Sequence, residues 1–274
     1  MSDISSESLK IHTELAEDLP PEVFEGEVIL QPGPDTHLYS QRKDGALGVE
    51  QLRLLQIRLR EIQNQQPFKR LLITSATRGE GKTHFSTNLA LTFASEGHRV
   101  LLIDADVRNP SVHLACGIPN SYGIKDWLQE GGNPWRAVRK IKRKNLYVIT
   151  GGTAAGEPFR SSSIAQLQIL LDRFAPAFDL IILDSAPLLG VVDTKLVSSL
   201  ADAILLVVRA GATSRDLVFQ AQELLEGQNT VGVVLNRVDP NLACFTSYYD
   251  YSAPTPQTPA KGAGGNLSIR ADRH

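Results

Sequence analysis

The sequence predicts an α/β protein in which a mostly parallel sheet is sandwiched between helices. Two observations lead to this fold class: apolar runs rich in Val, Ile and Leu recur along the chain, and segments with helical periodicity alternate with them. Unbroken apolar runs are typical of strands in a parallel sheet, because helices cover both of its faces. Ligands of such sheets bind at the edge where the strands have their carboxyl ends.

Residues 46–240 are predicted to form one domain between two tails. Residues 1–45 carry many acids and several prolines, which predicts a disordered tail. From Gly48 to Gln66, Leu and Ile recur at three- and four-residue steps, so we expect an amphipathic helix that packs on the domain or on a neighbouring subunit. Residues 241–274 contain tyrosines followed by Pro, Ala and Gly, which predicts a flexible tail.

The regular elements of the domain follow from its alternating patterns. Strands are predicted at residues 70–75, 100–104, 146–150, 180–184, 203–208 and 231–235. Helices are predicted at residues 82–95, 163–174, 194–200 and 214–226. Because right-handed crossovers make consecutive strands run the same way, the residues that follow them should meet at one edge of the sheet.

A phosphate-binding loop is predicted between the first of these strands and the first helix. Residues 75–83 read SATRGEGKT, which matches the phosphate-loop pattern except that Ala76 replaces its first Gly. Backbone N–H groups of such a loop surround a polyphosphate, while Lys82 reaches the β- and γ-phosphates and the Thr83 hydroxyl ligates Mg²⁺. The fold is therefore predicted to be of the P-loop NTPase kind, with a nucleotide site that includes Gly79, Glu80, Gly81, Lys82, Thr83 and His84.

Acidic side chains follow two further strands. Asp104 and Asp106 follow the run Leu101–Ile103, and a strand's period of two lets both carboxylates point the same way. Two neighbouring carboxylates repel each other unless a cation lies between them, and the Mg²⁺ of a nucleotide would supply that cation. Arg108 would bind a phosphate or hold the two acids in place.

Two more strand ends complete the predicted site. Asp184 follows an apolar strand, as does the Mg²⁺-binding acid of phosphate-loop proteins. Asn236 ends the last strand, where its amide would bind an adenine ring or only close a turn. The predicted metal ligands are Thr83, Asp104, Asp106 and Asp184.

Residues 47–240 resemble the cytoplasmic kinase module of the bacterial tyrosine kinases, the BY-kinases of capsule and exopolysaccharide synthesis. The resemblance rests on the loop at 75–83, the D-x-D-x-R segment at 104–108 and the D-x-x-P segment at 184–187. The related ParA and MinD ATPases place a signature Lys at the start of their loop, where this chain has Thr77. The sequence therefore departs from the ATPases where it agrees with the kinases.

The resemblance implies an ATP- and Mg²⁺-dependent protein-tyrosine autokinase that regulates polysaccharide synthesis and export. It implies transfer of the γ-phosphoryl group of ATP, largely between subunits, to tyrosines near the C-terminus, here Tyr248, Tyr249 and Tyr251. The catalytic residues that it implies are Lys82, Asp104, Asp106 and Asp184, of which Asp104 or Asp106 would assist removal of the phenol proton. The three tyrosines would otherwise form an aromatic patch that docks the tail on the domain.

The resemblance also implies several partners. The family builds a ring through an E-x-x-R-x-x-R segment of its first helix, and this chain has Glu50, Arg53 and Gln56 at those places. A separate membrane-bound activator and a tyrosine-phosphatase counterpart are expected as well. The basic residues between Arg136 and Lys144 would contact anionic lipids or simply face solvent.

Composition favours a cytoplasmic protein that its partner recruits to the inner face of the membrane. No apolar run reaches the roughly 18 residues of a membrane span, and a net charge of −2 does not suggest nucleic acid. The distant cysteines, Cys116 and Cys244, predict neither a disulfide framework nor a zinc site. Two other functions stay open: a ParA/MinD-type ATPase, and an ATP-dependent scaffold of a polysaccharide assembly machine.

Overall fold

A computed structural model of the chain describes residues 27–31, 38, 46–154 and 161–239. The proposed acceptors Tyr248, Tyr249 and Tyr251 lie outside these residues. All of the described residues up to Arg237 belong to one compact unit of the chain. Among the described residues, no helix is long and apolar enough to cross a membrane.

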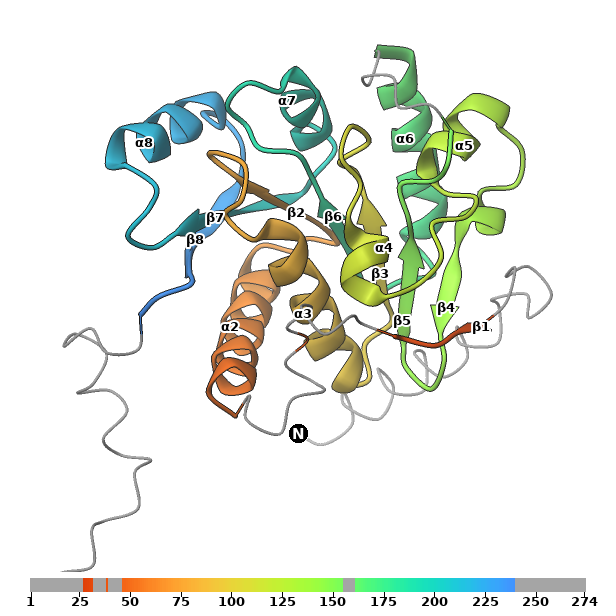
Figure 1. Cartoon of the computed structure of the whole chain (residues 1–274), viewed down its shortest axis with the longest axis horizontal. Coiled ribbons are helices and arrows are strands. Elements are labelled where there is room, and N and C mark those ends of the chain that lie inside the picture. Colours follow the sequence, from red (N-terminus) through yellow and green to blue (C-terminus); the bar gives the residue numbers. More distant parts are fainter. Residues whose placement is uncertain (1–26, 32–37, 39–45, 155–160, 240–274) are drawn as a thin grey trace, which may run out of the picture. The chain divides into compact units, whose positions relative to one another are not determined.

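The centre of this unit is an eight-stranded sheet with the strand order β1-β4-β5-β3-β6-β2-β7-β8 (Figure 1). All neighbouring strands are parallel except β4 and β5, which are antiparallel. The mostly parallel sheet confirms the predicted fold class. The strands are β1 (Glu27–Val28), β2 (Arg70–Ser75), β3 (Val100–Asp104), β4 (Arg139–Ile141), β5 (Leu146–Ile149), β6 (Leu180–Asp184), β7 (Ala203–Arg209) and β8 (Thr230–Asn236).

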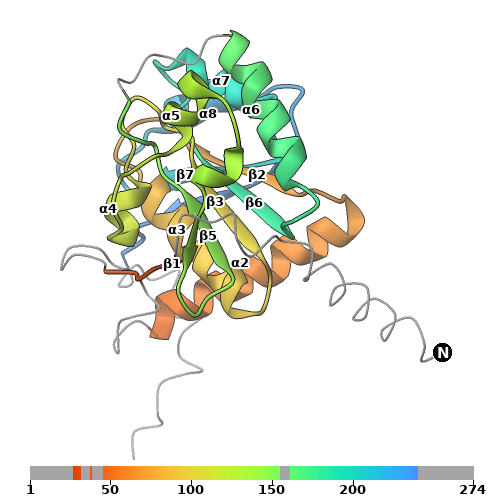
Figure 2. The same ribbon diagram turned by 90° about the vertical axis from the view of Figure 1, so that its right-hand side faces the viewer.

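Helices cover the sheet on both faces, with α2, α3 and α4 on one face and α5, α6, α7 and α8 on the other (Figures 1 and 2). Alternate residues of the central strands enter two separate apolar clusters, Leu71 and Leu102 on the first face, Leu72 and Leu101 on the second. The helical segments are α2 (Ala46–Gln65), α3 (Lys82–Ser95), α4 (Val112–Cys116), α5 (Ile124–Glu130), the 3₁₀ turn η2 (Pro134–Ala137), α6 (Ser161–Phe174), α7 (Val192–Ser198) and α8 (Arg215–Leu224).

The predicted amphipathic helix is α2, and its apolar stripe packs on its own domain. Leu52 and Leu59 are buried in the cluster that contains α3, while Leu55 and Ile62 pack against that cluster. The sequence left open whether this stripe packs on the domain or on a neighbouring subunit, and the structure shows that it packs on the domain.

The β1 end of the sheet contains the elements that the sequence did not predict, namely β1, β4, α4, α5 and η2. Within the region predicted as a disordered tail, Glu27–Val28 pairs with β4, the Gln31 N–H donates to the Cys116 carbonyl at 3.3 Å, and Leu38 is buried. Strands of two and three residues are too short to show an alternating pattern in the sequence. They form because they pair with strands that are distant in the chain. The limits of the domain itself, 46 and 240, stay predictions.

Candidate nucleotide-binding site

The loop after β2 has the backbone that its glycines permit. Gly79 and Gly81 have φ angles of 84° and 90°, a left-handed region that glycine enters without steric cost. Helix α3 begins directly afterwards at Lys82. Ala76, which replaces the first Gly of the pattern, is fully buried in the apolar cluster of the second face. The predicted strand, loop and helix are all present, with the loop amides at a helix N-terminus.

Three central strands bring the predicted acids and the loop to one edge. Strand β6 lies between β2 and β3, and Asp104 at the end of β3 is the register partner of Asp184 at the end of β6. The Ala105 N–H donates to the Asp184 carbonyl at 2.7 Å, which continues the pairing beyond β3. The two carboxylates are therefore neighbours at the carboxyl edge, next to the strand that carries the loop.

Each of these two buried carboxylates is only half satisfied. Asp104 Oδ2 accepts from the backbone N–H groups of Ser111 and Val112 at 2.8 and 2.9 Å, and Asp184 Oδ1 accepts from the Ser86 hydroxyl at 2.9 Å. Asp104 Oδ1 and Asp184 Oδ2 are buried and have no hydrogen-bond partner in the part of the chain that the structure describes. Buried oxygens without a donor are costly, and a ligand bound between the two acids would relieve this cost.

Burial, together with repulsion from neighbouring carboxylates, shifts the pKa values of both acids upwards. Desolvation is the main cause for Asp104, whose pKa lies well above its usual value, and the neighbouring Asp184 raises it further. Desolvation raises the pKa of Asp184 to about 6, against the opposing effects of the Thr83 hydroxyl and the Lys82 ammonium. A cation between the two acids would relieve both effects.

Lys82 is buried at the first position of α3. Desolvation lowers the pKa of its ammonium, and Asp184 and Asp106 act in the opposite direction. The structure thus brings together Lys82, Asp104, Asp106 and Asp184, the four residues predicted to be catalytic. Of these, Asp106 is the most accessible carboxylate, and its Oδ1 accepts from the Asn109 N–H at 3.0 Å.

The donor set at this edge fits Mg²⁺ bound together with a nucleotide. The Thr83 hydroxyl lies 2.9 Å from the Ser111 hydroxyl, beside the segment whose N–H groups hold Asp104. Among the described residues, no group of three or more His, Cys, Asp and Glu side chains could hold a metal ion. Mg²⁺ usually takes only one or two protein carboxylates and completes its shell with phosphate and water, so two acids and a hydroxyl suffice.

Three predicted ATP-binding residues have partners within the protein. Arg108 pairs with Asp193 of α7 through Nε at 2.8 Å and a second nitrogen at 3.3 Å, and this carboxylate raises the pKa of the guanidinium. The Asn236 amide donates to the Glu80 carbonyl at 2.8 Å, and its Oδ1 accepts from the next backbone N–H. The His84 ring lies 3.1 Å from the Asn88 amide. Their contact with ATP stays a prediction.

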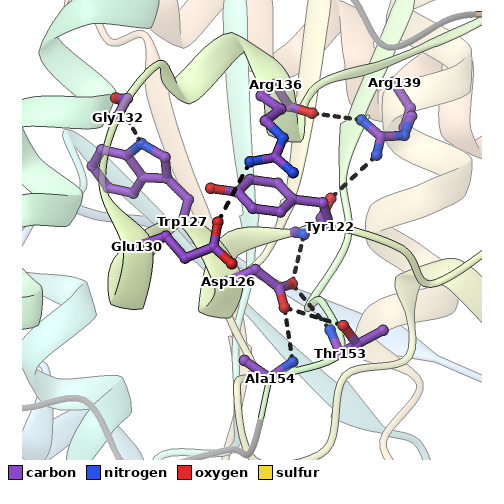
Figure 3. A network of polar contacts seen from close by, with 10 residues as sticks. Tyr122, Asp126, Trp127, Glu130, Gly132, Arg136, Arg139, Thr153 and Ala154 are labelled. Atoms are coloured by element: carbon purple, nitrogen blue, oxygen red, sulfur yellow. Dashed lines mark hydrogen bonds and ion pairs between the residues drawn. The ribbon is translucent and has the colours of Figure 1, made fainter.

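The edge beside β5 is built around a different carboxylate, that of Asp126 in α5 (Figure 3). Its Oδ2 accepts from the N–H groups of Gly123 and Thr153 at 2.8 and 3.0 Å. Its Oδ1 accepts from the Thr153 hydroxyl and the Ala154 N–H at 3.1 and 2.9 Å. These four donors outweigh desolvation, so that the pKa of Asp126 is lowered. Asp126 therefore fixes the segment that follows β5.

Part of the basic run lies in the same network (Figure 3). Arg139 is buried and donates to the carbonyls of Arg136 and Val138 at 2.7 and 3.3 Å and to the Ser121 hydroxyl at 3.0 Å. The guanidinium of Arg136 stacks over the Tyr122 ring, 4.1 Å from its centroid. These two arginines therefore bind other parts of the domain, whereas Lys142 and Arg143 are exposed.

Several residues of the site were not found from the sequence, namely Ser86, Ser111, Asp126, Asp193 and Thr213. Ser86 lies one helical turn after Lys82, so the spacing in α3 could have indicated it. Asp193 and Thr213 lie 85 and 133 residues from their partners Arg108 and Glu80. The Ser111 hydroxyl contacts Thr83, 28 residues away, and Asp126 binds Thr153, 27 residues away. Only the folded structure reveals those contacts.

Comparisons with known proteins agree with this geometry. Residues 71–250 match the CobQ/CobB/MinD/ParA nucleotide binding domain. Tyrosine-protein kinase YwqD of Bacillus subtilis is 33% identical over 193 residues, which cover 70% of this chain and 81% of that protein. Tyrosine-protein kinase CpsD of Streptococcus agalactiae is 32% identical over 186 residues, which cover 67% and 81%.

A solved structure leads to the same family. The kinase domain of Escherichia coli tyrosine kinase ETK aligns with a TM-score of 0.66 at 26% identity, covering 78% of this chain and 92% of that domain. Fold and site together define a phosphate-loop nucleotide-binding protein of the MinD and ParA type. Within that class, the chain belongs to the family of bacterial tyrosine kinases. The predicted family and the predicted enzyme class, a protein-tyrosine kinase, are both confirmed.

Proposed function

We propose that this chain is an ATP- and Mg²⁺-dependent tyrosine autokinase that regulates capsule or exopolysaccharide synthesis and export. The observation that carries the proposal is the pair of neighbouring buried acids, Asp104 and Asp184, each with an unpartnered oxygen at the sheet edge beside Lys82. Such a pair favours a nucleotide-bound metal ion. The relatives that are named tyrosine-protein kinases support phosphoryl transfer over simple nucleotide binding.

The residues of the site have different roles in the proposed phosphoryl transfer. Lys82 and the loop amides bind the phosphates, and the Thr83 hydroxyl, Asp104 and Asp184 would hold Mg²⁺, which neutralises developing charge when bound. Asp106 would accept the proton from the tyrosine hydroxyl, because it is more accessible than the fully buried Asp104. A carboxylate is a weak base for a phenol, so the proton leaves late in the transfer.

The proposed acceptors are Tyr248, Tyr249 and Tyr251, phosphorylated by a neighbouring subunit of a ring-like homo-oligomer. We further propose a membrane-bound activator that recruits the kinase to the inner face of the membrane, and a tyrosine phosphatase that reverses the modification. No nucleic-acid partner is proposed, since the net charge is −2. Light scattering with Mg-ATP tests the ring; a monomer at all concentrations, before and after phosphorylation, would contradict it.

Phosphotyrosine mass spectrometry after incubation with Mg-ATP tests the central proposal. Phosphate on the C-terminal tyrosines is expected for the wild type and for the surface control Lys142→Met, and none for Lys82→Met. ATP hydrolysis without phosphotyrosine would instead favour the ParA/MinD-type ATPase. ATP-dependent assembly without either activity would favour the scaffold.

A further inference from the structure

Thr77, where the related ATPases have their signature Lys, hydrogen bonds within the loop itself. Its backbone N–H donates to Glu80 Oε2 at 3.3 Å, and its hydroxyl donates to Glu80 Oε1 at 3.2 Å. Glu80 is three residues further along the loop and is buried, with 1% of its surface exposed. Thr77, the residue that distinguishes this loop from that of the ATPases, thus holds the buried carboxylate of Glu80 inside the loop.

A third donor connects this carboxylate to another strand end. The hydroxyl of Thr213, in the turn between β7 and α8, donates to Glu80 Oε1. A buried carboxylate needs such donors, because desolvation without hydrogen bonds is costly. Strand β7 is the direct neighbour of β2, on the side opposite to β6. The loop is therefore fixed on the side away from Asp184.

The backbone of Glu80 is held as well, from the end of β8. The Asn236 amide donates to the Glu80 carbonyl, and a Cβ atom on Gly81 would lie 2.3 Å from the Asn236 amide nitrogen. Because a trans peptide is planar, its N–H points opposite to its C=O, so fixing this carbonyl also fixes the direction of the Gly81 N–H. The φ angle of 90° favours glycine at position 81, and a Cβ there would push the Asn236 amide away from the Glu80 carbonyl.

We propose that Glu80 is a positioning residue for the nucleotide, anchored by Thr213 in the turn after β7 and by Asn236 at the end of β8. These contacts fix the loop amides before a nucleotide binds, so that binding costs less conformational entropy of the loop. The inference rests on the proposed ATP site and adds to it the residues that shape the loop. Glu80 itself does not react, since its carboxylate is occupied by Thr77 and Thr213.

The affinity for Mg-ATP, measured by calorimetry on the full-length chain, tests this inference. Glu80→Gln replaces one acceptor oxygen by a donor, and Thr213→Val removes the hydroxyl; each is expected to raise the Kd about tenfold. In the double variant the two effects should be clearly less than additive, because both changes act on the same hydrogen-bonded side chain. Thr213→Ser, which keeps the hydroxyl, should restore wild-type affinity.

Two matched controls separate positioning from general destabilisation. Thr230→Val and Glu223→Gln change exposed residues outside the loop and should leave the Kd unchanged. Thermal unfolding of all variants without nucleotide identifies any loss of folding. An unchanged Kd in folded Glu80→Gln and Thr213→Val, or additive effects in the double variant, overturns the inference. Wild type that binds Mg-ATP without forming phosphotyrosine refutes the proposed kinase activity but leaves this inference standing.

Discussion

The sheet edge carries two kinds of buried carboxylate, and they differ in how completely they are hydrogen bonded. Asp104 and Asp184, at the ends of β3 and β6, each retain a buried oxygen with no partner among the described residues. Asp126, beside the end of β5, accepts four hydrogen bonds from three residues. A bound ligand would satisfy the first pair, as the proposed nucleotide site requires, whereas Asp126 already has the partners that it needs.

The pKa shifts of the two kinds of site follow from this difference. Burial dominates at Asp104 and Asp184, and their pKa values are raised. Hydrogen bonds outweigh burial at Asp126, and its pKa is lowered. A negative charge therefore destabilises the unliganded fold at the nucleotide site and stabilises it beside β5. Function and stability make opposite demands on the same type of side chain.

The largest effect is expected when Asp184 is replaced by Asn. Activity should fall by about 100-fold or more, because one of the two buried acids that would hold Mg²⁺ loses its charge. The free energy of unfolding without nucleotide should stay the same or rise, since repulsion from Asp104 is removed. Phosphotyrosine formation and urea unfolding at pH 7.5 measure the two quantities. If Asp184→Asn were less stable but fully active, Asp184 would have the structural role assigned to Asp126 and no role in binding Mg²⁺.

The pH dependence of stability gives the next effect. The pKa of Asp184 is about 6 in the folded chain, above its usual 3.8, so the folded state binds more protons between these values. Stability without Mg²⁺ should therefore fall as the pH rises from about 4 to 7, by roughly 2–3 kcal/mol for this group. Urea unfolding of the wild type and Asp184→Asn at several pH values measures it. The same slope in both proteins would show that other groups cause it.

Replacing Asp126 by Asn should cost about 2 kcal/mol of the free energy of unfolding. In either orientation the new amide nitrogen faces N–H or hydroxyl donors, so about half of the hydrogen bonds are lost. The lowered pKa means that this stabilisation is complete above pH 4 and is lost as the pH falls through the lower, folded-state pKa. Chemical unfolding at pH 7 measures the cost, with Asp216→Asn on the exposed surface of α8 as the control. Equal stability of the two variants would contradict the structural role of Asp126.

The central part of the fold was predictable because its strands are long, apolar and buried on both faces. The predicted bounds of β2, β3, β6 and α3 agree with the structure, and the order of the chain places Asp104, Asp184 and Lys82 at one edge. The phosphate loop and the strand-end acids carry their signal in local sequence. Both could therefore be predicted before any tertiary contact was known.

The rest of the site depends on contacts that local sequence does not show. Arg108 was expected to bind phosphate or the neighbouring acids, but its partner in the structure is Asp193, 85 residues away in sequence. Thr213 and Glu80 are separated by 133 residues, and Asp126 binds a segment 27 residues later. No periodicity indicates such pairs, because each depends on how loops from different strands meet at the edge.

The smallest effect is expected at the exposed end of the Asp126 network, where Glu130 pairs with Arg136 at 3.4 Å. Both side chains are more than half exposed, so water screens their attraction, and Arg136 can still stack on the Tyr122 ring. Glu130→Gln should therefore change the free energy of unfolding by less than about 0.5 kcal/mol and leave phosphotyrosine formation intact. Chemical unfolding of Glu130→Gln and Asp126→Asn under the same conditions compares their free energies of unfolding. A loss as large as that of Asp126→Asn would show that exposed charge pairs, and not buried hydrogen bonds, stabilise the β5 side of the edge.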